Sequence, residues 1–125
     1  MKLLLDKHVL LWWLDSPALL SADAQAAIAD RANEVLISAA VAWEISIKQS
    51  IGKLTVRGDI EQAIQSAGFN SLPMMPSHAW GVKVLAMIHR DPFDRLLISQ
   101  AIAENATIVT RDAEFGKYPV AVLPA

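Results

Sequence analysis

The sequence predicts a three-layer α/β/α domain with a mainly parallel central sheet. Short apolar segments without polar alternation fit strands that are covered on both faces. Segments with the apolar spacing of helices lie between them, so strands and helices alternate along the chain. A length of 125 residues, without linker or repeat, suits one core, and we expect a single domain over residues 1–125.

Strands and helices are expected at the following places along the chain. The strands are Leu3–Leu5, Val35–Ile37, Thr107–Val109 and Val120–Leu123, with a weaker one near Ser71–Leu72. The helices between them are 21–32, 38–52, 59–68, a segment from 77 through 87, and one that begins at 91. Asp59 and Gln62 have the spacing of a capping box, and Gly68 can end the helix that they begin.

The last two helical segments differ in character. In the segment that begins at Ser77, Trp80, Val84 and Met87 fall in one helical register. The helix that begins at Asp91 has proline at its first position and is apolar on most sides. We therefore expect this last helix to be buried.

Composition limits the classes of function. Hydrophobic residues make up 54% and charged residues 19%, so the chain is expected to fold and to keep apolar surface for a partner. The net charge of −2 gives no global attraction for nucleic acid, so RNA binding would depend on metal ions and on local Lys and Arg. The absence of cysteine excludes disulfides, a thiolate nucleophile and a cysteine zinc site.

Neither a signal peptide nor a transmembrane segment is expected. The apolar run at the amino terminus is too short for a secretory signal, and no segment is long enough to cross a bilayer. These features predict a soluble cytoplasmic protein without a membrane partner.

Four carboxylates are expected to meet at one edge of the sheet. Asp6 follows the first strand and Asp112 follows the Thr107–Val109 strand, and the carboxyl ends of parallel strands share one edge. Glu44 and Asp94 lie near the beginnings of helices that can face the same edge. Such acids repel one another unless a cation neutralises them, and their oxygens suit Mg²⁺ or Mn²⁺. One or two such ions can activate water for phosphodiester cleavage.

Each acid also has a structural alternative. Asp6 can cap the helix that follows it, and Asp112 can begin a short turn over residues 113–115. Asp94 can compensate the dipole of its helix, and Glu44, with no evident cationic partner, can be purely structural. Asp91 has the full signature of an N-cap, so we favour it as a cap over a metal ligand.

Four segments resemble the motifs of VapC-type PIN domains, in the same order along the chain. They are residues 3–14 (LLLDKHVLLWWL), 38–45 (SAAVAWEI), 89–101 (HRDPFDRLLISQA) and 110–115 (TRDAEF). The resemblance implies a PIN-like fold and a Mg²⁺- or Mn²⁺-dependent endoribonuclease that acts as the toxin of a toxin–antitoxin pair. It also implies neutralisation by a VapB-like antitoxin.

The resemblance assigns the catalytic site to the same four acids, Asp6, Glu44, Asp94 and Asp112. The metal is expected on Asp6, Asp94 and Asp112, with Thr110 orienting the last acid. Lys7 departs from the pattern, because relatives usually carry Thr or Ser there. Its ammonium can lower cation affinity, point away, or hold a substrate phosphate.

Several other side chains near the motifs have alternative roles. Arg95, Arg90 and Arg111 are candidates for RNA contacts, with Arg95 favoured, although ordinary surface charge is the alternative. His8 and His89 can be ligands, but packing is favoured for both. The high apolar fraction predicts a homodimer and grooves that accept an amphipathic antitoxin helix.

Two other classes of protein are alternatives to this interpretation. A phospho-acceptor receiver domain has similar length, but it requires adjacent acids after the first strand, and Asp6 stands alone. A catalytically weakened PIN domain that mainly binds its antitoxin is the second rival, and Lys7 favours it. The sequence does not identify the RNA target or the antitoxin.

Overall fold

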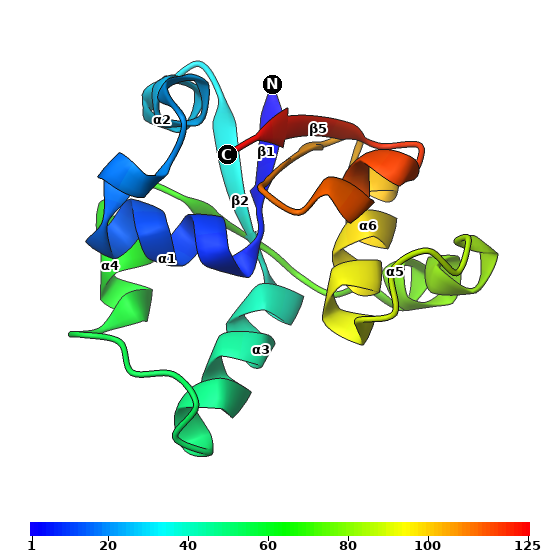
Figure 1. Ribbon diagram of the computed structural model, residues 1–125, viewed down its shortest axis with the longest axis horizontal. Coiled ribbons are helices and arrows are strands. Elements are labelled where there is room, and N and C mark those ends of the chain that lie inside the picture. Colours follow the sequence, from blue (N-terminus) through cyan, green and yellow to red (C-terminus); the bar gives the residue numbers. More distant parts are fainter.

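The computed structural model describes residues 1–125 and has a five-stranded, all-parallel sheet (Figure 1). The strands are β1 (Lys2–Leu5), β2 (Glu34–Ser38), β3 (Asn70–Leu72), β4 (Thr107–Thr110) and β5 (Ala121–Pro124). Their order is β3-β2-β1-β4-β5, and Leu4 of β1 pairs with Leu36 of β2 and with Ile108 of β4. All five predicted strands, including the weaker one at 71–72, are therefore confirmed.

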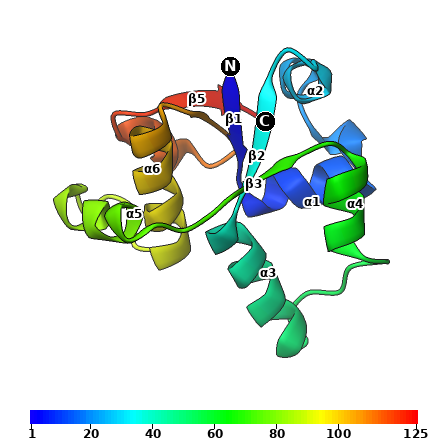
Figure 2. The same cartoon turned by 180° about the vertical axis from the view of Figure 1, so that it is seen from behind.

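Helices cover both faces of the sheet, which confirms the predicted three layers. They are α1 (Lys7–Asp15), α2 (Ala22–Ala29), α3 (Ala39–Ser50), α4 (Ile60–Ser66), α5 (Pro76–Gly81) and α6 (Pro92–Glu104), with 3-10 turns η1 (Pro17–Leu19), η2 (Val82–Val84) and η3 (Ala113–Lys117). Figures 1 and 2 show α1, α2 and α4 on one side of the sheet and α5 and α6 on the other. None of these helices has the length and apolar composition to cross a membrane.

The core consists of the strands and of the helix faces turned toward them. Twenty-three buried apolar residues form one cluster, in which Leu3, Leu4 and Leu5 of β1 are completely buried. Burying a side chain of this size stabilises the fold by about 1.5–3 kcal/mol. The central strand therefore fixes where its carboxyl end, and Asp6 after it, must lie.

A buried polar link joins the two helices that carry Glu44 and Asp94. Ser38 ends β2, caps α3 by accepting a hydrogen bond from the amide of Ala40 at 3.0 Å, and donates its hydroxyl proton to Gln100 of α6. Buried polar groups are stable only when hydrogen-bonded, so this link fixes α3 against α6. The relative position of the two acids depends on it.

The expected helix over residues 77–87 is wrong in extent. Helix α5 begins earlier, at Pro76, and gives way at Val82 to the 3-10 turn η2, after which residues 85–91 are irregular. The carbonyl oxygens of Val82, Leu85 and Ala86 accept hydrogen bonds from the Arg95 guanidinium. Because these oxygens are bound to a side chain, they do not continue an α-helical ladder.

The side chains of Trp80, Val84 and Met87, which were expected in one helical register, lie on the surface as a result of this break. Their exposed fractions are 70%, 79% and 74%. Helix α2 is also shorter than predicted and ends at Ala29, because Asp30 leaves the helix and its carboxylate accepts a hydrogen bond from the amide of Ala32 at 2.9 Å.

Candidate metal centre

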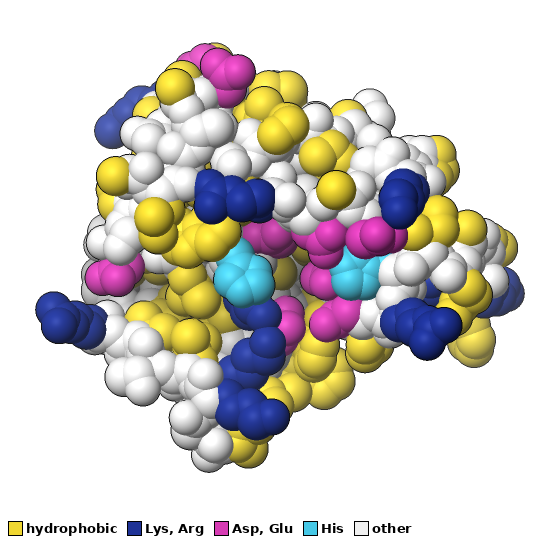
Figure 3. All heavy atoms as spheres, viewed as in Figure 1, with side chains coloured by type: hydrophobic (Ala, Val, Ile, Leu, Met, Phe, Trp, Pro, Cys, Tyr) yellow, Lys and Arg dark blue, Asp and Glu magenta, His cyan; other side chains and the backbone are white.

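A cleft lies at the carboxyl edge of the sheet, where the chain order reverses beside β1. It has a volume of about 220 Å³ and is lined by Asp6, Lys7, His8, Glu44, Asp91, Asp94, Asp112 and Phe115. Figure 3 shows acidic side chains gathered there with two histidines, and Lys and Arg side chains beside them. Ligands of open α/β sheets bind at this kind of topological switch point.

Asp6 has both of the roles that the sequence left open. One carboxylate oxygen caps α1 by accepting a hydrogen bond from the amide of Val9 at 2.8 Å. The other accepts the hydroxyl proton of Thr110, whose oxygen in turn accepts the amide of Asp112 at 3.1 Å. Burial raises the pKa of Asp6, although these hydrogen bonds oppose the rise. Thr110 therefore orients both Asp6 and the segment that carries Asp112.

Asp94 lies in the first turn of α6, and among the acids of the cleft its pKa departs most from the ordinary value. Desolvation, followed by the nearby Asp91 carboxylate, raises the pKa of Asp94 to about 7, although His89 opposes the rise. The charges of Glu44 and Asp6 contribute in the same direction. The cleft thus holds more negative charge than its own side chains neutralise.

His89 contacts two of the acids, although the sequence favoured a packing role for this side chain. Its Nε2 lies 3.1 Å from Asp94 Oδ2 and 2.9 Å from Asp112 Oδ2. Its Nδ1 accepts the amide of Asp91 at 3.3 Å, so Nε2 carries the hydrogen that is donated to the acids. The ring also packs edge-on against Phe115, so packing and a polar role coexist. The only sequence signal was its place next to the Asp91-Pro92 helix start.

Asp112 is the acid that the surrounding hydrogen bonds favour as a carboxylate. Desolvation alone would raise its pKa, but the amide of Glu114 and the His89 ring together lower the pKa of Asp112. The Glu114 amide donates at 2.9 Å, so Asp112 also begins the short turn η3, as the structural alternative predicted.

Glu44 has two cationic partners, and the expectation that it lacks one is wrong. It is buried, with 5% of its surface exposed, and its Oε2 lies 3.1 Å from Lys7 Nζ and 3.3 Å from Lys48 Nζ. Lys48 follows Glu44 by four residues on α3, a spacing that signals such a pair. Lys7 comes from α1, which no local pattern could show. Lys7 therefore turns into the cleft.

Asp91 caps α6, as its motif predicted. Its Oδ1 accepts the amides of Phe93 at 2.8 Å and of Asp94 at 3.2 Å. Asp91→Asn is expected to keep the free energy of unfolding within about 0.5 kcal/mol of the wild type, because Asn caps equally well, whereas Asp91→Ala should cost about 1 kcal/mol. Urea unfolding of both variants measures this difference, and equal losses would contradict the capping role.

The three arginines proposed as RNA contacts differ in their surroundings. Arg95 is buried, and its guanidinium donates to backbone carbonyl groups of residues 82–89 and to the hydroxyl of Tyr118. Its donors are used inside the protein, which argues against the RNA contact predicted at Arg95. Arg111 stacks over Trp12 at 4.3 Å and donates to the carbonyl group of Ala125. Arg90 is exposed and makes no hydrogen bond or ion pair, so it remains a candidate.

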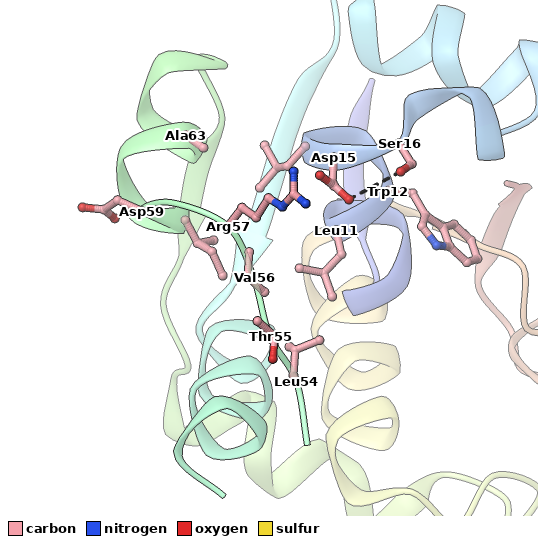
Figure 4. A pocket seen from close by; sticks show the side chains of 12 residues that line it. Leu11, Trp12, Asp15, Ser16, Leu54, Thr55, Val56, Arg57, Asp59 and Ala63 are labelled. Carbon is pink, nitrogen blue, oxygen red and sulfur yellow. Dashed lines mark hydrogen bonds between the residues drawn. The ribbon is translucent and has the colours of Figure 1, made fainter. Parts of the chain in front are cut away.

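A second hollow, lined by both apolar and polar side chains, runs between α1 and the segment that leads into α4 (Figure 4). Its volume is about 630 Å³, and Leu11, Trp12 and Leu14 of α1 face Leu54 and Ile60 across it. Asp15, Arg57 and Asp59 add charges to its lining, and Arg57 extends across it toward Asp15 (Figure 4). Apolar side chains on both walls, with charged groups among them, have the chemistry of a groove for an amphipathic helix.

Comparisons with known proteins agree on the architecture. A family model described as PIN domain matches residues 3–121. A sequence search among curated proteins finds no significant match.

Solved structures of low sequence identity share the fold over their whole length. VapBC2 from Rickettsia felis, bound to a DNA fragment from its promoter, has a TM-score of 0.74 at 18% identity, covering 100% of this chain and 99% of that one. FitAB bound to an IR36 DNA fragment has a TM-score of 0.69 at 21% identity, covering 98% and 94%. DNA-bound VapBC from Salmonella typhimurium has a TM-score of 0.66 at 13% identity, covering 99% and 98%.

Proposed function

The chain belongs to the PIN-domain family of nucleases, and we propose that it is a metal-dependent endoribonuclease acting as the toxin of a VapBC-type toxin–antitoxin pair. The observation that carries the proposal is the meeting of Asp6, Asp94 and Asp112 in one cleft at the switch point of the sheet. The raised pKa of Asp94 supports it, because the cleft has the charge of a cation site.

The donor set fits a hard divalent cation. Asp6, Asp94 and Asp112 offer carboxylate oxygens in a cleft without cysteine, which suits Mg²⁺ or Mn²⁺ better than a thiolate-binding metal. When bound, such an ion lowers the pKa of a bound water and stabilises charge on a phosphodiester. We therefore assign the metal to these three acids and leave Glu44 as a supporting residue.

The protein's own residues prepare the acids for this role. Thr110 and the amide of Val9 fix both oxygens of Asp6, so its carboxylate enters the cleft in one orientation. His89 donates its Nε2 hydrogen toward Asp94 and Asp112 and holds these two carboxylates near one another. A cation bound beside Asp94 would offset the neighbouring negative charges and would therefore favour the ionised form of this carboxylate.

Metal binding and cleavage test the proposal together. We expect millimolar Mn²⁺ to raise the melting temperature of the wild type, because a ligand that binds only the folded state stabilises it. The stabilisation should vanish in Asp94→Asn, and the wild type should cleave single-stranded RNA with Mn²⁺ but not with EDTA. An unchanged melting temperature in the wild type, with no cleavage, would contradict a metal-dependent nuclease.

A protein partner is proposed from two surfaces. Two of the solved structures above are named as VapBC2 and VapBC bound to DNA, and the groove beside α1 offers this chain a place for a helix of a VapB-like antitoxin. We place a homodimer contact on the exposed apolar side chains of Trp80, Val84 and Met87. Leu11→Asp should abolish antitoxin binding, and Val84→Asp should give a monomer in analytical ultracentrifugation, with neither variant affecting the other property.

A catalytically weakened domain is the second candidate, and the inward Lys7 ammonium favours it. At an effective dielectric near 20, a unit charge a few ångströms away opposes a divalent ion by several kcal/mol, and solvent reduces this to about 1–2 kcal/mol. Lys7→Thr is therefore expected to raise Mn²⁺ affinity about tenfold. It should also lower the metal-free stability slightly, because Glu44 loses one ion-pair partner.

Calorimetric titration of Mn²⁺ into both proteins measures this effect. Lys2→Thr is the matched control, because Lys2 lies at the amino end of β1, far from the cleft edge of the sheet. Equal Mn²⁺ affinities of the wild type and Lys7→Thr would show that the ammonium does not act on the metal.

A further inference from the structure

The geometry points to an anion subsite in the cleft, in which Lys7 and Lys48 bind a backbone phosphate of the substrate and Glu44 positions both ammonium groups. The inference rests on the proposed function for the identity of the substrate, a single-stranded RNA. It assigns a phosphate-binding role to two lysines and a positioning role to an acid outside the metal set.

The first observation is that both lysines meet at one atom. Lys7 Nζ donates to Glu44 Oε2 at 3.1 Å, and Lys48 Nζ lies 3.3 Å from the same oxygen. Each ammonium has three N–H donors, and Glu44 is the only acceptor that Lys7 contacts. Each lysine therefore keeps donors for a further acceptor.

The second observation is the difference in burial along the group. The side chain of Glu44 is 6% exposed, that of Lys7 is 13% exposed and that of Lys48 is 37% exposed. Glu44 thus forms the floor, Lys7 lies within the cleft, and Lys48 reaches its margin. This arrangement gives an anion access from solvent to both ammonium groups.

The group formed by Lys7, Lys48 and Glu44 differs in charge from the rest of the cleft. Two ammonium groups and one carboxylate carry a net charge of +1, whereas Asp6, Asp94 and Asp112 gather negative charge on the other side. Figure 3 shows Lys and Arg side chains bordering the acidic group on the same face. A phosphodiester carries one negative charge on two free oxygens, which two ammonium groups can bind as point charges.

The same contacts explain why Glu44 is not a metal ligand in this chain. A cation at Oε2 would lie against two ammonium groups, and their repulsion would oppose it. A buried carboxylate without a cation would be costly, so the lysines also stabilise Glu44 in its place. Glu44 thereby holds the two ammonium groups at a fixed distance from the acids.

The test measures RNA binding without cleavage. A fluorescein-labelled single-stranded RNA of about 12 nucleotides is titrated by anisotropy in EDTA at several salt concentrations. Lys7→Gln and Lys48→Gln are each expected to weaken binding about fivefold and to reduce the slope of log affinity against log salt by about 0.7. Lys2→Gln, which removes the same charge at the amino end of β1, should leave both quantities near the wild-type values.

A second arm concerns Glu44 and uses calorimetry with Mn²⁺ alone. Glu44→Gln should lower Mn²⁺ affinity by no more than about tenfold, the size of the opposite charge effect expected for Lys7→Thr, whereas loss of a direct ligand should abolish measurable binding. The RNA affinity of the same variant in EDTA should differ from that of the wild type, because the Glu44 carboxylate no longer holds Lys7 and Lys48 in place. Retention of Mn²⁺ affinity with altered RNA binding is the result that a merely structural glutamate would not give.

The outcomes distinguish this inference from the proposed function. If Lys7→Gln and Lys48→Gln bind RNA as Lys2→Gln does, the subsite is wrong, whatever the protein cleaves. If Glu44→Gln loses Mn²⁺ binding, Glu44 is a metal ligand and its positioning role is wrong. RNA that binds through both lysines but is not cleaved with Mn²⁺ would contradict the proposed nuclease and support the subsite.

Discussion

Asp94→Asn is expected to reduce RNA cleavage on the order of a thousandfold while making the metal-free protein more stable at pH 8. The loss of cleavage follows because the substitution removes a charged oxygen ligand from the proposed metal site, and such preorganised charge is a large part of catalysis. The isosteric amide keeps the side-chain volume, so the fold is retained. Cleavage of a fluorogenic RNA with Mn²⁺ measures the first effect.

The gain in stability follows from the pKa of Asp94. The fold raises this pKa from 3.8 to about 7, so the folded state binds the proton more tightly than the unfolded state does. This contribution to the free energy of unfolding is complete below the unfolded pKa and is lost as the pH rises through about 7. At pH 8 the ionised Asp94 therefore destabilises the fold, and an amide does not.

The magnitude must be reduced for solvent screening, because a quarter of the Asp94 side chain is exposed. We expect Asp94→Asn to be more stable by about 1–2 kcal/mol at pH 8 and by much less near pH 4. Urea unfolding in EDTA at the two pH values measures this. If the variant were less stable than the wild type at pH 8, the ionised Asp94 carboxylate would already be stabilised by a cationic side chain. The cleft would then not need a metal ion to neutralise it.

The central sheet could be predicted because its determinants are local. Continuous apolar runs such as Leu3–Leu5 fit only strands buried on both sides, and the caps at Ser38, Asp59 and Asp91 each accept an amide of their own helix. The meeting of Asp6 and Asp112 could also be predicted, because the ends of parallel strands share one edge. Topology therefore located these two acids.

Two contacts that the sequence did not predict join side chains that are distant in sequence. Lys7 and Glu44 are 37 residues apart, and their contact depends on how α1 and α3 pack. The His89 link to Asp112 spans 23 residues and depends on an irregular segment. No periodicity reports such contacts, so the residue types could be found but not their pairing.

Arg95→Met is expected to lower the free energy of unfolding by about 3 kcal/mol, because it leaves the carbonyl groups of Leu85 and His89 without a donor and removes a second donor from those of Val82 and Ala86. The guanidinium donates to the carbonyl groups of Val82, Leu85, Ala86 and His89 at 3.0 to 3.3 Å. Four acceptors arranged around one planar group require the fork geometry of arginine. Lysine has three donors on one atom, so Arg95→Lys should recover only part of the loss.

The same clamp determines how His89 reaches the acids. The hydroxyl of Tyr118 accepts the amide of His89 at 2.7 Å and donates to Ala86, so Arg95 and Tyr118 together fix the segment that precedes α6. In Arg95→Met this segment loses the hydrogen bonds from Arg95 and keeps only those of Tyr118, and we expect cleavage to fall with stability.

The matched control is Arg90→Met, which removes an exposed guanidinium five residues away and should change stability by less than about 0.5 kcal/mol. Urea unfolding and RNA anisotropy of both variants separate the two roles. Unchanged stability of Arg95→Met with weakened RNA binding would restore the RNA contact that the sequence suggested. A large loss of stability for Arg95→Met alone would instead identify Arg95 as the residue that holds the His89 side of the cleft in place.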